Sequence, residues 1–252
     1  TNEQNADGFY STEDLTSTFS NAEFSLALRG TVLTLPGSSL LDKTAYSQTI
    51  RDIAQQYLNR RQLRLYPDTV VSTAIGGIAQ SYPSYYYAAA VAGACASVAP
   101  QEPFTRLPLV GFSDVTGPDL ERAHLDTISA GNAVVEVDVP GERPAFRLQA
   151  TTDVSSIESR EWSITRAVDF FAKTLRGQLK RRIGRFNITQ AYIDDISVLL
   201  DGACTSAVTN GIFRSAVVTK LEQDKTQPDT LLIDIQLEVL FPANYIQLTL
   251  VV

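Results

Sequence analysis

The sequence predicts an α/β domain followed by an α+β domain that ends in an exchangeable β-strand. Three observations favour this fold class. Strand-like and helix-like segments alternate as far as about residue 150, two long helical segments follow, and the last part of the chain shows the two-residue alternation of strands. We therefore expect an α/β domain over 41–150, an α+β domain over 151–241 and a linking strand over 242–252. Residues 1–40 show little periodicity and are expected to form an N-terminal segment or arm.

Within the first domain, apolar residues at helical spacing predict a helix over 42–61. Pro118 in a first turn and Gly131 beyond a last turn predict another helix between them. A Pro- and Gly-rich turn separates two alternating segments, which predicts a pair of strands there. The remaining predicted elements complete the alternation that is typical of α/β domains: a strand over 62–71, a small-residue helix over 82–98, a short strand over 107–112, and the paired strands 133–139 and 145–151.

Two long helices are predicted to open the second domain, over 158–183 and 189–209, and Asn210-Gly211 ends the second of them. Strands are then predicted over 212–221 and 230–241, joined by a polar loop. In the last of these strands the apolar residues from Ile233 to Phe241 occupy one face, and acidic and amide side chains occupy the other. This pattern predicts a sheet that is buried on one face only.

A further alternating segment follows Pro242, which cannot donate a hydrogen bond to a strand ladder. We expect this segment to be a strand whose edge no later residue of the sequence covers. Such a strand can be added to the sheet of another subunit. Its predicted linking residues are Tyr245, Ile246, Leu248, Leu250 and Val252.

Several motifs, in their order and spacing, resemble those of contractile tail sheath proteins from myovirus-type phages and phage-tail-like particles. The ending Pro242-Ala-Asn-Tyr-Ile resembles the family's P-x-N-Y-I ending. Earlier motifs resemble its small-residue helix, the strand before its C-terminal domain, its long helix and the turn after that helix: residues 85–96, 148–153, 166–176 and 183–187. The match covers residues 70–252, whereas residues 1–69 match poorly.

The resemblance implies a structural protein rather than an enzyme. It implies a subunit that polymerises helically, as stacked rings or a lattice, around a tail tube protein. Contraction of this sheath would drive the tube through the target envelope, as in other contractile injection systems. The resemblance also implies a subtilisin-like sheath core in the α/β domain, a location in the virion tail and assembly in the host bacterial cytoplasm. It gives no reason to expect nucleic-acid binding or membrane contact by this chain.

The charge of residues 160–185 differs from that of the rest of the chain. This segment holds eight cationic and two acidic residues, whereas the whole chain has a net charge of −7. Four of the cations share one predicted helix face. The residues alone leave three interpretations: a solvated face favoured by the helix dipole, a nucleic-acid surface, or a surface that binds an acidic protein. The resemblance implies that this domain touches the tail tube, so we expect tube binding by Arg166, Lys173, Arg176, Lys180 and Arg181.

The runner-up interpretation is an α/β hydrolase-like or ligand-binding enzyme. A Ser-His-Asp triad would have to use His124, the one histidine, and no Gly-x-Ser-x-Gly elbow occurs. His124 is instead expected at a helix surface or interface. Cys95 and Cys204 are far apart and lie among small residues, which predicts buried reduced thiols. No spacing predicts a metal site, and no motif predicts a cofactor.

Overall fold

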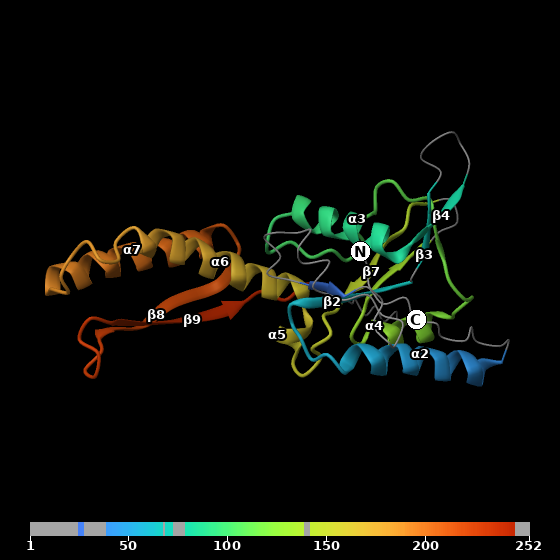
Figure 1. Ribbon diagram of the computed structural model, residues 1–252, viewed down its shortest axis with the longest axis horizontal. Helices are drawn as coiled ribbons and strands as arrows, with labels where there is room; N and C mark the ends of the chain where they lie inside the picture. The colour runs from blue at the N-terminus through green and yellow to red at the C-terminus, as the bar shows by residue number, and fades with distance from the viewer. Residues whose placement is uncertain (1–24, 28–38, 68, 73–78, 139–141, 245–252) are drawn as a thin grey trace, which may run out of the picture. The chain divides into compact units, whose positions relative to one another are not determined.

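The computed structural model describes residues 25–27, 39–67, 69–72, 79–138 and 142–244 (Figure 1). The chain divides into two compact units. Unit 1 comprises Thr1–Thr165 together with Ala243–Val252, and unit 2 comprises Arg166–Pro242. Unit 2 is therefore inserted in the sequence of unit 1. The domain limits expected at residues 150 and 241 stay a prediction.

The central sheet of unit 1 consists of β1 (Ser25–Ala27), β2 (Gln62–Tyr66), β6 (Ala133–Glu136) and β7 (Ala145–Gln149). The strand order is β1-β2-β6-β7. β2 runs parallel to both β1 and β6, whereas β7 is antiparallel to β6. Every residue of β2 is buried, as expected for a strand with both faces covered.

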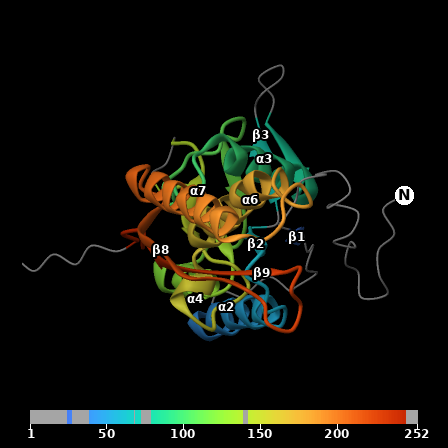
Figure 2. The same cartoon turned by 90° about the vertical axis from the view of Figure 1, so that its left-hand side faces the viewer.

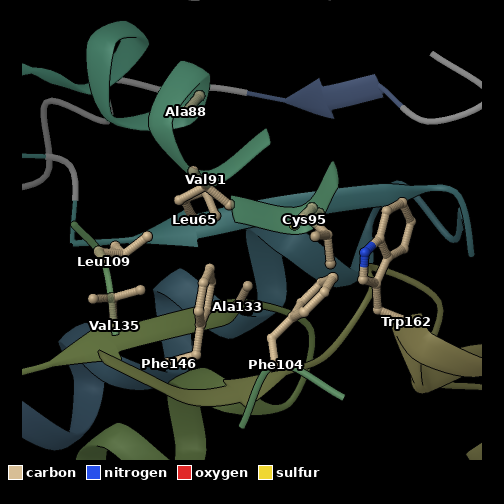
Figure 3. Close-up of a cluster of buried hydrophobic side chains, with 11 residues drawn as sticks. Leu65, Ala88, Val91, Cys95, Phe104, Leu109, Ala133, Val135, Phe146 and Trp162 are labelled. Carbon is tan, nitrogen blue, oxygen red and sulfur yellow. The ribbon is translucent and has the colours of Figure 1, made fainter. Parts of the chain in front are cut away.

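Helices lie on both faces of this sheet: α3 (Ser84–Ser97) on one, and α2 (Leu40–Gln55) and α4 (Arg122–Ser129) on the other (Figure 1). Successive residues of β2 point to opposite faces, so Leu65 packs towards α3 and Tyr66 towards α2 and α4. Figure 3 shows the α3 side, where Val91 and Cys95 lie over Leu65 and the rings of Phe104 and Phe146. The predicted mixed α/β architecture is confirmed for the described part of unit 1.

A second, antiparallel sheet has the order β4-β3-β5 and comprises β3 (Thr69–Ser72), β4 (Gln80–Pro83) and β5 (Asp114–Thr116). The single strand predicted over 62–71 is therefore two strands. Pro67 lies between them and has no N–H for a ladder. The strand predicted over 107–112 is wrong. This segment pairs with β7 only through an isolated bridge between Pro108 and Ala145, and the preceding Arg106 has a φ of +68°.

The single helix predicted over 158–183 is also wrong, because the chain forms α5 (Ile157–Arg160) and then α6 (Trp162–Lys180). Glu161 separates them with an extended backbone, φ −78° and ψ 114°. It forms an isolated β-bridge with Ala150, and the N–H of Thr151 donates to the carbonyl of Arg160 at 2.8 Å. A tertiary backbone contact thus overrides the local helical pattern.

Unit 2 places α6 and α7 (Gln190–Thr209) over one face of an antiparallel hairpin, β8 (Phe213–Gln223) and β9 (Leu231–Val239) (Figures 1 and 2). The ring of Phe171 meets the edge of Phe213 at a centroid distance of 5.4 Å, which joins helix to hairpin. In β9, Ile235 and Leu237 pack against this core, whereas Gln236 is exposed. The predicted one-sided sheet is confirmed.

Candidate assembly surfaces

The cationic side chains of α6 do not share one environment. Arg166 is buried, with 9% of its surface exposed, whereas Lys173, Arg176, Lys180 and Arg181 are exposed. Arg166 lies in the first turns of the helix, where the residues from Glu161 to Ala167 are all buried. The helical spacing thus placed Arg166 on the same face as three other cations but could not show where the helix leaves the protein interior.

The four exposed cations form a surface that we call the cationic strip: Lys173, Arg176, Lys180 and Arg181. Within the part of the chain that the structure describes, none of the four takes part in an ion pair. Arg182, the next residue, differs because it pairs with Asp195 of α7. The strip therefore presents four positive charges that take part in no ion pair within the described residues.

Two apolar side chains lie beside the strip in the turn between α6 and α7. Ile183 is 73% exposed and Phe186 is 63% exposed. The ring of Phe186 contacts that of Tyr192 at a centroid distance of 6.0 Å. Gly184 between them has a φ of +73°, a conformation that glycine adopts at little cost. The turn thus combines cationic and apolar groups at the surface of unit 2.

The β8–β9 hairpin offers backbone edges as a second candidate surface. Each of the two strands pairs only with the other among the described residues. An unpaired edge presents N–H and C=O groups that can accept another strand. The linking strand predicted from the sequence, Tyr245 to Val252, lies outside the described residues.

Asn244, the residue directly before that segment, belongs to unit 1. Both the oxygen and the nitrogen of its side-chain amide form hydrogen bonds. The hydroxyl of Thr105 donates to its Oδ1 at 2.9 Å, and its Nδ2 donates to Glu161 Oε1 at 3.0 Å. Asn244 and Glu161 also line a cavity of about 80 Å³ with Asp126, Arg160 and four other residues. Nothing in the sequence pattern signalled this contact, because its three residues come from distant parts of the chain.

Comparison with known proteins bears on what these surfaces serve. No protein-family model matches the sequence. The chain is 27% identical over 224 residues to the tail sheath protein of Mycobacterium phage Bxz1. The chain is thus similar in sequence to a phage tail sheath protein. The match covers 88% of this chain and 36% of the phage protein, so this chain spans about a third of the length of that relative.

The fold of this chain is also found in solved sheath structures. A chain of the contracted helical sheath of the anti-feeding prophage matches it with a TM-score of 0.61 at 14% identity, over 86% of this chain and 68% of the other. The sheath tail protein of Desulfitobacterium hafniense matches with a TM-score of 0.55 at 13% identity, over 94% and 62% of the two chains. The resemblance predicted from the motifs is thereby confirmed.

His124 is buried, which corrects the expectation of a surface or interface position. Only 5% of it is exposed, and its Nε2 lies 3.3 Å from the hydroxyl of Thr44. The side chain thus packs α4 against α2. Its position four residues before the buried Ile128 was the signal for an inward-facing side chain.

The other titratable candidates have structural surroundings. Cys95 and Cys204 are buried and are not joined in a disulfide, as predicted. Burial and the nearby Asp201 charge raise the pKa of the Cys204 thiol. Asp194 accepts a hydrogen bond from Gln190 at 2.9 Å. Among the described residues no group of three His, Cys, Asp or Glu side chains could hold a metal ion, and no helix is long and apolar enough to cross a membrane.

Proposed function

We propose that the chain is a structural subunit of a contractile tail sheath. Such a subunit polymerises helically around an inner tube, and contraction of the sheath drives the tube through the target envelope. The observation that carries the proposal is the sequence relationship to a phage tail sheath protein over 224 residues. The likeness to a chain of a contracted helical sheath supports it at the level of the fold.

The deciding experiment is electron microscopy of the purified full chain over a range of concentrations, alone and with tubes from the matching particle. The proposal expects rings or hollow tubes with helical order. A chain that stays monomeric at every concentration and does not coat tubes would contradict it. In cells, the assembled protein is expected in the virion tail after assembly in the host bacterial cytoplasm.

A structural role without catalysis is part of the proposal. The sheath core is proposed to be subtilisin-like, on the support of parallel strands covered by helices on both faces. The buried side chain of His124 lies beside Thr44, so a hydrolase triad would need this helix contact to open. No observation favours the hydrolase-like or ligand-binding alternative over the sheath subunit.

Subunits are proposed to be linked by residues 245–252. We propose that this segment pairs with the β8–β9 hairpin of a neighbouring subunit. The unpaired edges of that hairpin among the described residues support an acceptor role. Main-chain hydrogen bonds would hold the neighbours together, and side chains at alternate positions would set the register.

The cationic strip is proposed to face the lumen of the assembly and to bind acidic side chains of the tube protein. Its support is the exposure of four cationic side chains that form no ion pair among the described residues, in a chain of net charge −7. Each exposed pair would contribute only about 0–1 kcal/mol. Repetition over many subunits gives a firm hold, while weak and screened single contacts permit release during contraction.

A further inference from the structure

Asn244 is held by two hydrogen bonds of opposite sense. Its carbonyl oxygen accepts from the Thr105 hydroxyl at 2.9 Å, and its amide nitrogen donates to Glu161 Oε1 at 3.0 Å. An amide satisfies both partners in one orientation only, because one end accepts and the other donates. The geometry thus selects asparagine over its isostere aspartate, which has no donor for Glu161.

Both partners of Asn244 belong to well-packed parts of unit 1. Thr105 follows Phe104, which has no exposed surface and lies in the core of Figure 3. Glu161 is 4% exposed, lies beside the fully packed Trp162, and is held by its backbone bridge to Ala150. The acceptor Glu161 and the donor Thr105 are therefore positioned by contacts other than those with Asn244.

The buried carboxylate of Glu161 in turn depends on the Asn244 amide as a hydrogen-bond donor. Its Oε1 also accepts from Arg160 at 3.2 Å, but its buried Oε2 has no hydrogen-bond partner. A buried carboxylate with few donors is costly, so the loss of one donor weakens the local fold. The hydrogen bond between Asn244 and Glu161 therefore stabilises both side chains.

We propose that Asn244 is an anchor that fixes the start of residues 245–252 on unit 1. This inference rests on the proposed exchange of that segment between subunits. β9 ends at Val239, and residues 240–244 form neither helix nor strand. The two hydrogen bonds of the Asn244 side chain tie the end of this connection to unit 1, so the segment starts from a defined point. A fixed starting point raises the effective concentration of the segment at a neighbour's sheet.

A swap of donor and acceptor tests the anchor in the full chain. Asn244→Asp places an oxygen opposite Glu161 and should release the segment. Glu161→Gln combined with Asn244→Asp restores a donor–acceptor pair in the reverse sense, because the introduced glutamine amide can donate to the new carboxylate while Thr105 still donates to it. Glu161→Gln alone keeps an acceptor for Asn244 and serves as the matched control.

The first measurement is chymotrypsin cleavage after Tyr245 in the unassembled chain, followed by mass spectrometry. A protease needs the flanking residues free and extended, so the rate reports the released population. Asn244→Asp should be cleaved roughly tenfold faster, from the loss of a hydrogen bond to a charged group, and the double variant should return near the original rate. Equal cleavage rates in all variants would overturn the anchor.

The second measurement is the critical concentration for polymer formation, by pelleting. It should rise in Asn244→Asp and recover in the double variant. Faster cleavage with unchanged polymerisation would overturn the anchor's role in linkage while the sheath function stands. If the unaltered chain forms no polymer, the proposed function fails, and cleavage alone decides whether the anchor exists. If Asn244→Asp does not fold, Thr105→Val removes the other bond without a new charge and should give the same two changes.

Discussion

At the residue scale, Arg147 is the clearest example of a half-buried charge that its surroundings compensate. Its guanidinium contacts Glu136 at 3.0 and 3.1 Å and Asp126 at 2.6 Å. Burial opposes its charge, but the hydrogen bonds and charges of Asp126 and Glu136 hold the pKa of Arg147 above its ordinary value. One side chain of β7 thereby connects α4, β6 and β7.

Arg147→Met should lower the free energy of unfolding by about 3 kcal/mol, because it leaves Glu136 without its partner in a site where that side chain is 13% exposed. Urea unfolding followed by circular dichroism measures the loss. The matched control is Asp138→Asn, which breaks the exposed pair with Arg106 and should cost less than about 1 kcal/mol. Equal losses in the two variants would contradict the assignment.

Cys204 should resist alkylation in the native chain. Burial raises the pKa of its thiol, so less of the reactive thiolate is present at pH 8 than in the unfolded chain. Iodoacetamide labelling with mass spectrometry should be slow in buffer and fast in urea. The same shift makes stability fall as the pH rises above the unfolded pKa of about 8.5, because the unfolded thiol ionises first. Equal labelling rates in buffer and urea would refute the buried environment.

At the scale of elements, sequence periodicity predicted those that depend on local pattern and failed where tertiary contacts decide. The helix expected over 189–209 lies at Gln190–Thr209, and the strand expected over 230–241 lies at Leu231–Val239. By contrast, the break at Glu161 depends on its bridge to Ala150, and β1 has only three residues. No local signal encodes either feature.

The N-terminus of α7 gives a prediction at this scale. The Thr189 hydroxyl accepts a hydrogen bond from the N–H of Tyr192 at 3.3 Å and caps the helix. Thr189→Ala should therefore destabilise unit 2 by about 1 kcal/mol. Thr205→Ala, at an exposed position in the C-terminal part of the same helix, should be neutral or slightly stabilising, because alanine has the higher helix propensity. Thermal unfolding of the two variants compares them directly, and a larger loss for Thr205→Ala would reverse the interpretation.

The candidate surfaces were also only partly predictable from the sequence, because tertiary packing decides which of their residues are exposed. Helical spacing identified Lys173, Arg176 and Lys180, which are exposed as a face away from the core requires. It also included Arg166, whose burial depends on how the first turns of α6 pack. The anchor at Asn244 joins residues 105, 161 and 244, so no pattern along the chain could reveal it.

At the scale of the whole molecule, charge reversal tests the proposed tube contact. Arg176→Glu with Lys180→Glu should abolish coating of tubes, or require far lower salt, while the melting temperature stays nearly unchanged because both side chains are exposed. Lys225→Glu, on the exposed loop of the hairpin, is the matched control and should coat tubes normally. Normal coating by the double variant, or a structure with the strip on the outer surface, would defeat the assignment.

Deletion of residues 245–252 tests the proposed linkage. The shortened chain should fold and melt as before but fail to form tubes, because each subunit loses the strand that it donates. Electron microscopy and differential scanning calorimetry give the two readouts. The deletion leaves Asn244 in place, so it separates loss of the strand from loss of its anchor. Tubes of normal length from the shortened chain would rule out strand exchange as the linkage.

The insertion of unit 2 within unit 1 has a consequence for how such a protein can be rebuilt. Unit 1 is completed by residues from both sides of the insertion, and Glu161 and Asn244 meet where the chain departs and returns. Because the two ends of the insertion lie close together in unit 1, a different segment can replace unit 2 without a change in the fold of unit 1. Replacement of residues 166–242 by a short flexible linker therefore removes unit 2 alone. Truncation at residue 165 would also remove residues 243–252, which belong to unit 1. Unit 2 is thus an exchangeable module, which evolution can alter while the fold of unit 1 is retained.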